Sequence, residues 1–218
     1  MGQSILYDGL SREQLFEALS CFGAAVKKFD VGETVAIFPN DTMTERTVGI
    51  IVEGTAQLAL CGSDGETYLS QLYDGEGVFG KMFLSESAED YYVIEAKTKC
   101  TVAYTDFERV SDFCENVCPI HVKFSRNLYR LIVAQSKADT KRLGIVSKKT
   151  LREKLLSYFS LCANDAGSEE FNINITLSEL AKYLCADRSA MMRELKKLKE
   201  EGILDAKGSH IKLKKHAR

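Results

Sequence analysis

Positively charged and hydroxyl side chains recur on one side of a short segment near the C-terminus. Residues 188–199 place Met191, Leu195 and Leu198 at helical spacing, which predicts a helix with one buried face. The opposite side is mostly polar and cationic and carries Arg188, Ser189, Met192, Arg193, Lys196 and Lys199. Guanidinium and ammonium groups bind anionic oxygens, so this stripe suits contact with a polyanion.

The charge of the chain is unevenly distributed along its length. The net charge is −2 over 218 residues, but residues 148–218 carry 15 Lys and Arg against 10 Asp and Glu, whereas residues 1–147 carry 14 against 21. A basic C-terminal third on an acidic body is expected when one module meets a polyanion and the other does not. Chance variation of the surface is the alternative.

Local signals predict the elements that position the cationic stripe. Thr176 and Glu179 have capping-box spacing, and the helix that follows buries Leu177, Leu180, Ala181 and Leu184. Residues 185–187 interrupt it, and Asp187 is a good N-cap for the second helix, which Gly202 ends. A two-stranded wing is predicted next, from residues 203–206 and 210–213, which a Lys-Gly turn joins. The segment is therefore predicted to be a winged helix-turn-helix, with a solvated helical hairpin as the alternative.

The N-terminal half shows a different periodicity. A capping box at Ser11 predicts a short helix over residues 11–20. Residues 26–106 contain short β-type runs separated by glycine turns, which indicate an antiparallel sandwich or barrel. The runs are residues 34–38, 48–52, 56–60, 68–73, 92–96 and 101–104.

A long helical pattern follows these strands. Apolar residues recur at near-heptad spacing from Ile120 through Phe124, Leu128 and Leu131 toward Ala138. Such a stripe could pair with a second copy of the chain, or it could lie on the sheets of its own chain. A further helix follows Thr150, and residues 164–168 are expected to end it as a loop.

Three segments of the C-terminal region resemble the DNA-binding domain of the Crp/Fnr family of bacterial transcription regulators. They are residues 150–156 (TLREKLL), residues 177–181 (LSELA) and residues 187–195 (DRSAMMREL). Residues 72–80 (LYDGEGVFG) are similar to a stretch of the family's β-barrel, and the resemblance covers essentially the whole chain. It implies an α+β fold in three parts: a cyclic-nucleotide-binding-like, jelly-roll type sensor barrel over residues 1–118, a dimerisation helix over 119–146, and a winged helix-turn-helix over 147–218.

The resemblance also implies a function, that of a homodimeric transcription regulator that binds near-palindromic double-stranded DNA. Recognition helices would enter successive major grooves about 34–36 Å apart, with RNA polymerase as a further partner. Three residues fall where the family reads base edges, namely Arg188, Ser189 and Arg193. Five fall where phosphate contacts would position the domain, namely Thr176, Ser178, Lys196, Lys207 and Ser209.

The sensor region departs from the cyclic-nucleotide-binding members of that family. Those members have a glutamate after the Phe-Gly pair and an arginine further along, whereas this chain has Lys81 and, near the arginine's place, Asp90. Because Asp90 would repel a cyclic phosphate, we expect that cyclic AMP and cyclic GMP do not bind. An unidentified small-molecule or redox signal would act instead, with an effector pocket built from Lys81, Met82, Tyr91, Tyr92, Gln135 and Ser136.

Metal and cofactor chemistry has weak support in the local spacing. The seven cysteines are scattered, and neither a C-x2-C nor an H-x3-H motif occurs, so we expect no metal site and in particular no structural zinc site. Only Cys21 lies where iron–sulfur relatives gather several cysteines, and His121 as a lone histidine does not indicate haem. Cys114 and Cys118 could form a redox pair, with two buried thiols as the alternative.

The remaining function classes are constrained by what the sequence lacks. The odd cysteine count without an apparent secretion signal predicts reduced thiols in a cytoplasmic protein, and no apolar run suggests a membrane partner. No catalytic triad or phosphate loop is visible, so we do not expect an enzyme. The alternative function is a small-molecule-binding module whose C-terminal domain docks a protein partner rather than DNA.

Overall fold

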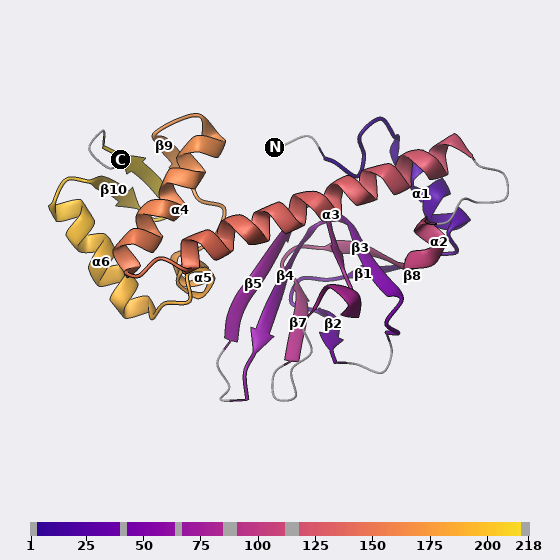
Figure 1. Ribbon diagram of the computed structural model, residues 1–218, viewed down its shortest axis with the longest axis horizontal. Coiled ribbons are helices and arrows are strands. Elements are labelled where there is room, and N and C mark those ends of the chain that lie inside the picture. The colour runs from indigo at the N-terminus through magenta and orange to yellow at the C-terminus, as the bar shows by residue number, and fades with distance from the viewer. Residues whose placement is uncertain (1–3, 40–42, 64–66, 85–90, 112–117, 215–218) are drawn as a thin grey trace. The chain divides into compact units, whose positions relative to one another are not determined.

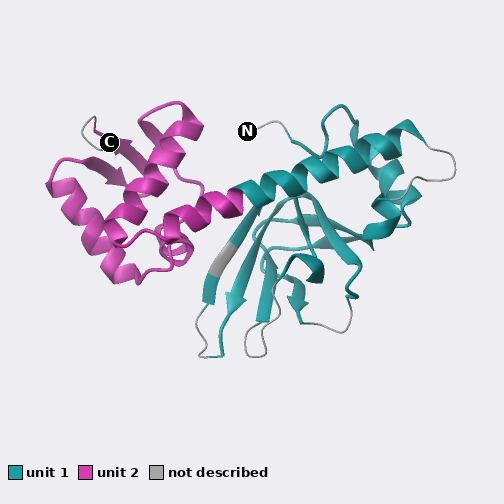
Figure 2. Cartoon of the chain, in the orientation of Figure 1, with its two compact units in different colours: residues 1–137 teal, residues 138–218 magenta. Residues whose placement is uncertain are grey.

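The chain is described by a computed structural model for residues 4–39, 43–63, 67–84, 91–111 and 118–214. It divides into two units, residues 1–137 and residues 138–218, each of which has its own buried core (Figure 2). The division falls within one long helix, α3 (Pro119–Val146) (Figure 1).

The described residues of unit 1 form eight strands in two antiparallel sheets, which confirms the expected fold class. The strands are β1 (Ala25–Phe29), β2 (Thr34–Phe38), β3 (Thr47–Glu53), β4 (Thr55–Cys61), β5 (Thr67–Asp74), β6 (Gly77–Phe79), β7 (Tyr91–Ala96) and β8 (Cys100–Asp106). One sheet has the order β1-β8-β3-β6 and the other has the order β2-β7-β4-β5. Each sequence-predicted run lies within a strand, whereas β1 and β6 were not among the predicted runs.

Two apolar layers hold unit 1 together. Between the sheets lie side chains such as Ile51, Val102 and Ile94, all less than 1% exposed. On the other face of the first sheet, Ile50 of the same strand β3 packs with Phe124 of α3 in a second cluster. Because successive side chains of a strand point to opposite faces, β3 is buried on both sides. The helices of this unit are α1 (Arg12–Cys21), α2 (Phe107–Ser111), the single-turn η1 (Lys81–Phe83) and the first part of α3.

The regular apolar stripe of the long helix packs against other residues of the same chain. Phe124, Leu128 and Leu131 are at most 4% exposed and pack with residues of α1, β3 and β6. The stripe considered for self-pairing therefore packs on the sheets of the same chain, as the alternative interpretation held. A second stripe of α3 faces away from this core, and its Tyr129 and Val133 are 45% and 52% exposed.

In the described residues of unit 2, three helices and the last part of α3 pack against a small sheet. The helices are α4 (Leu151–Ala166), α5 (Leu177–Tyr183) and α6 (Arg188–Glu200), and the strands are β9 (Glu170–Asn172), β10 (Leu204–Lys207) and β11 (His210–Leu213) in the order β10-β11-β9. The wing was expected to have two strands, and β9 adds a third because Phe171 pairs with Ile211 and is buried. Helix α4 also runs on through the predicted loop to Ala166, and Gly167 ends it with φ of +63°.

In the described part of the chain, no helix combines the length and the apolar character that crossing a membrane requires.

Candidate nucleic-acid interface

The two helices of the predicted helix-turn-helix begin at side-chain caps. At the start of α5, the Thr176 Oγ1 accepts a hydrogen bond from the Glu179 N–H at 3.2 Å, and Glu179 Oε2 accepts from the Thr176 N–H at 2.8 Å. At the start of α6, Asp187 Oδ1 accepts from the Ala190 N–H at 2.7 Å. These bonds satisfy N–H groups that have no partner inside the helix, so local sequence determines where both helices start.

The turn between α5 and α6 has an unusual backbone. Cys185 has φ of +50°, a left-handed conformation that residues with a Cβ rarely adopt. Two cations bind the carbonyl groups on either side of the end of α5. Arg142 donates to Tyr183 O at 3.0 Å, and Lys154 donates to Leu184 O at 3.2 Å. Because helix C-termini carry partial negative charge, these contacts stabilise the turn that orients α6.

Helix α6 separates its apolar and cationic sides. Met191, Leu195 and Leu198 are at most 4% exposed and pack in the core of unit 2. Arg188, Ser189, Met192, Arg193 and Lys196 are exposed on the outside. Among the residues that the structure describes, neither Arg188 nor Arg193 forms an ion pair, so both guanidinium groups can bind an external partner.

Two carboxylates at this helix, Glu194 within α6 and Glu201 directly after it, pair with an arginine of another helix. Arg152 of α4 binds Glu194 at 3.4 Å and also pairs with Glu201, the residue after α6. The hydrogen bond with Glu201 raises the pKa of Arg152, and the same bond lowers the pKa of Glu201. This network holds α6 against α4 and uses carboxylates that would otherwise repel a polyanion.

The wing presents some of its cations and pairs others internally. Lys207 and Ser209 are exposed at the turn, where Gly208 has φ of +62°. Lys212 binds Glu170 at 2.8 Å and Lys214 binds Asp205 at 3.1 Å. The hydrogen bonds from Lys212 and then from His210 lower the pKa of Glu170, so this carboxylate stays ionised and holds β9 to β11.

The eight predicted DNA-contacting residues therefore all lie in unit 2. Thr176 is exposed and Ser178 is half-buried in the first turn of α5. Lys196 is exposed and lies 3.7 Å from Glu200. Lys199 of the predicted stripe points elsewhere, because its ammonium donates to Ala206 O at 2.9 Å.

Sequence reasoning did not find the residues that position this surface. Arg142, Arg152 and Lys154 contact partners 30 to 49 residues away along the chain. No local pattern encodes contacts at such separations, and only the charge of these residues gave a signal.

Comparison with known proteins agrees with this geometry. Residues 153–218, which contain α5, α6 and the wing, match the Crp-like helix-turn-helix domain. The chain is 23% identical over 159 residues to the probable transcriptional regulator flp of Lacticaseibacillus casei, with 73% of this chain and 69% of that protein covered.

Solved structures extend the Crp/Fnr likeness to the fold of the whole chain. A CooA variant from Carboxydothermus hydrogenoformans superposes with a TM-score of 0.70 at 17% identity, covering 98% of this chain and 92% of that one. The c-di-GMP-responsive regulator CLP of Xanthomonas campestris gives 0.65 at 17% identity, covering 93% of this chain and 99% of that one. Together with the domain match, this confirms the resemblance to the Crp/Fnr family of DNA-binding transcription regulators.

Two of the residues expected to line an effector pocket have partners within unit 1. Lys81 pairs with Glu45 at 2.9 Å. Gln135 of α3 binds the backbone of β6, because its Oε1 accepts from the Val78 N–H at 2.7 Å and its Nε2 donates to Val78 O at 2.9 Å. The other four are on the surface or half-buried, namely Met82, Tyr91, Tyr92 and Ser136. Asp90, on which the argument against cyclic nucleotides also depends, lies outside the described residues.

Proposed function

We propose that this chain is a homodimeric, sequence-specific DNA-binding transcription regulator whose DNA affinity responds to a small-molecule or redox signal. The observation that carries the proposal is the outer face of α6. It exposes Arg188, Ser189 and Arg193, while the opposite face of the same helix is anchored in the core. A rigid helix with a cationic outer face is the device by which helix-turn-helix proteins read the major groove.

Base reading is assigned to three residues of α6. The guanidinium groups of Arg188 and Arg193 can each donate two hydrogen bonds to O6 and N7 of guanine, and the Ser189 hydroxyl can donate or accept. They occupy positions i, i+1 and i+5, which on a helix lie on one side within about one and a half turns.

Phosphate contacts are assigned to residues on three different elements. Thr176 and Ser178 lie at the start of α5, Lys196 on α6, and Lys207 and Ser209 at the wing turn. Contacts of this kind fix the register of the protein on the duplex without reading its sequence. Their contribution to affinity depends on counterion release and therefore falls as salt rises.

Dimerisation is assigned to the exposed stripe of α3. Val122, Tyr129 and Val133 recur with spacings of seven and four, and Leu143 follows ten residues later at 63% exposed. This is heptad spacing, the pattern by which two helices pack along a shared seam. The first three also line a groove of about 640 Å³ whose other lining residues include Ile5. Regulators of this family act as dimers, and this stripe supplies an apolar face for one.

Detection of the signal is assigned to unit 1. The signal is either an apolar or aromatic effector or a redox change. We expect cyclic AMP and cyclic GMP not to bind at micromolar concentrations. Lys81 is engaged with Glu45 and stands where cyclic-nucleotide-binding members of the family have a glutamate.

The test is a comparison of two variants on a duplex selected from a random library. Arg193→Ala should weaken binding to the selected duplex by about 1–3 kcal/mol and relax the preference at one base pair per half-site. Lys207→Ala should weaken the selected and a scrambled duplex about equally and lower the salt dependence of binding. Fluorescence anisotropy over a salt series measures both effects.

Two results would contradict the proposal. Unchanged base preference in Arg193→Ala would show that α6 does not read the sequence. Failure of the wild-type chain to bind any duplex with steep salt dependence would favour a protein-docking function for unit 2.

A further inference from the structure

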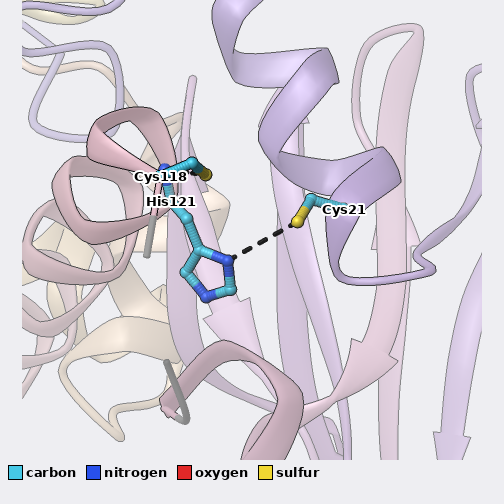
Figure 3. A group of neighbouring side chains, drawn as sticks. All are labelled: Cys21, Cys118 and His121. Atoms are coloured by element: carbon cyan, nitrogen blue, oxygen red, sulfur yellow. Dashed lines mark hydrogen bonds between the residues drawn. The ribbon is translucent and has the colours of Figure 1, made fainter. Parts of the chain in front are cut away.

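Three soft or borderline metal-ligating side chains meet in unit 1 at the junction of two helices. Cys21 is the last residue of α1, Cys118 immediately precedes α3, and His121 lies in the first turn of α3 (Figure 3). Their donor atoms lie within 4.8 Å of one another, and Cys21 Sγ is 3.7 Å from His121 Nδ1. Cys21 and His121 are 100 residues apart along the chain, so only the fold brings them together.

We propose that Cys21, Cys118 and His121 form a binding site for a Zn²⁺-class divalent metal ion. Zinc bonds of about 2.3 Å to sulfur and about 2.0–2.1 Å to nitrogen place the donors of a tetrahedral site about 3.6–3.8 Å apart. The distance from Cys21 to His121 already has this value, and the other pairs need to close by about 1 Å at most. Thiolate and imidazole ligands also suit zinc, whereas magnesium and calcium are bound mainly by oxygen ligands.

The surroundings hold the ligands in place. The His121 ring is 4% exposed and packs edge-on against Phe22, with ring centroids 4.2 Å apart. Cys118 Sγ accepts a hydrogen bond from the His121 N–H at 3.3 Å, which orients the sulfur toward the start of α3. Two thiolates neutralise the charge of a divalent cation, so the occupied site adds no net charge beside this apolar ring.

The orientation of the His121 ring also favours a metal ion at this position. Its Nδ1 is directed at Cys21, and its buried Nε2 has no partner among the described residues. A metal ion bound at Nδ1 would leave the ring proton on Nε2, so the neutral imidazole has its free electron pair on the nitrogen that faces the two sulfur atoms. Cys21 is exposed, so an ion can enter from solvent, and three protein ligands leave the fourth tetrahedral position to water or another donor.

This site differs from the expectation drawn from local spacing, which indicated no metal site. That expectation considered motifs of neighbouring cysteines and histidines, whereas these ligands come from two separate segments. An ion here would join the end of α1 to the start of α3, the helix whose exposed stripe is assigned to dimerisation.

The test is a titration of the reduced, tag-free full-length chain with Co²⁺, a spectroscopic substitute for Zn²⁺. Wild type should bind one ion per chain with a thiolate-to-cobalt charge-transfer band, and Zn²⁺ should displace it. Cys21→Ser and Cys118→Ser should each weaken binding by more than about 100-fold, since loss of an outer-shell partner alone costs about 10–100-fold. Cys185→Ser removes another exposed cysteine, in unit 2, and is the matched control that should bind like wild type.

A second measurement shows whether weaker binding in a variant comes from the lost ligand or from loss of folding. Saturating Zn²⁺ should raise the unfolding temperature of wild type and Cys185→Ser but not that of Cys21→Ser, since a ligand stabilises only the state that binds it. Circular dichroism of the metal-free proteins should be the same for all of them. Equal affinity and equal spectra for Cys21→Ser and wild type, or no stoichiometric binding by wild type, would overturn the assignment.

Discussion

Replacement of Val133 by glutamate should convert the chain from a dimer into a monomer. Val133 is 52% exposed in one chain, so pairing of two α3 helices would cover about half of its side chain. Loss of that burial costs about 1 kcal/mol per protomer, and desolvating a carboxylate without a partner adds about 2 kcal/mol or more. A twofold axis repeats both costs, which gives about 6 kcal/mol per dimer, or about a 10⁴-fold weaker association.

Sedimentation velocity over a dilution series measures this change directly. The control is Val31→Glu, which makes the same substitution at a valine that is 66% exposed and lies in the turn before β2. Val31→Glu should remain dimeric and should bind a duplex with two half-sites as wild type does. Leu131→Glu is not a suitable test, because Leu131 is 4% exposed in the core of its own chain and its loss would disrupt unit 1.

The reasoning would be refuted if Val133→Glu and Val31→Glu dimerised with the same affinity. The apolar stripe of α3 would then serve another contact, and the interface of the dimer would lie on a different surface.

Two further predictions concern the stability of unit 2. Cys185→Gly should stabilise the α5–α6 turn by about 1 kcal/mol relative to Cys185→Ala, because glycine adopts the observed φ of +50° without a Cβ clash. Hydrogen exchange of peptides covering α5 and α6 should show about fivefold greater protection, and equal protection in both variants would contradict a strained residue at this position. Partners in the folded state lower the pKa of Glu170, so its stabilising contribution is present above about pH 4.3 and is lost as the pH falls through the folded-state pKa. Glu170→Gln should therefore make exchange in β9 and β11 less acid-sensitive than in wild type, and an unchanged acid dependence would show that this carboxylate does not link β9 to β11.

The features predicted correctly from the sequence are those encoded within a few residues. The capping boxes predicted at Ser11 and Thr176 each involve a partner three residues away, and both are present. The β-type runs between glycine turns and the amphipathic pattern of α6 are also local signals. Each signal reflects physical chemistry that operates within one element.

The features missed from the sequence depend on partners far along the chain. Strands β6 and β9 have three residues each, too few to show alternation, and they exist because Gly49 and Ile211 are positioned opposite them. The two apolar stripes of α3 look alike in the sequence, and only packing against the sheet separates the inner stripe from the outer one. The cluster around His121 likewise requires the fold.

The contact of Gln135 with β6 has a consequence for association between molecules. Strand β6 is at the edge of its sheet, and an edge strand normally offers its N–H and C=O groups to any other extended chain. The Gln135 amide pairs with both groups of Val78 and so acts as a one-residue substitute for a neighbouring strand. Displacing this part of α3 from the sheet would uncover a template for β-pairing between molecules. The same amide therefore protects unit 1 against edge-to-edge aggregation and penalises any sliding of the helix over the sheet.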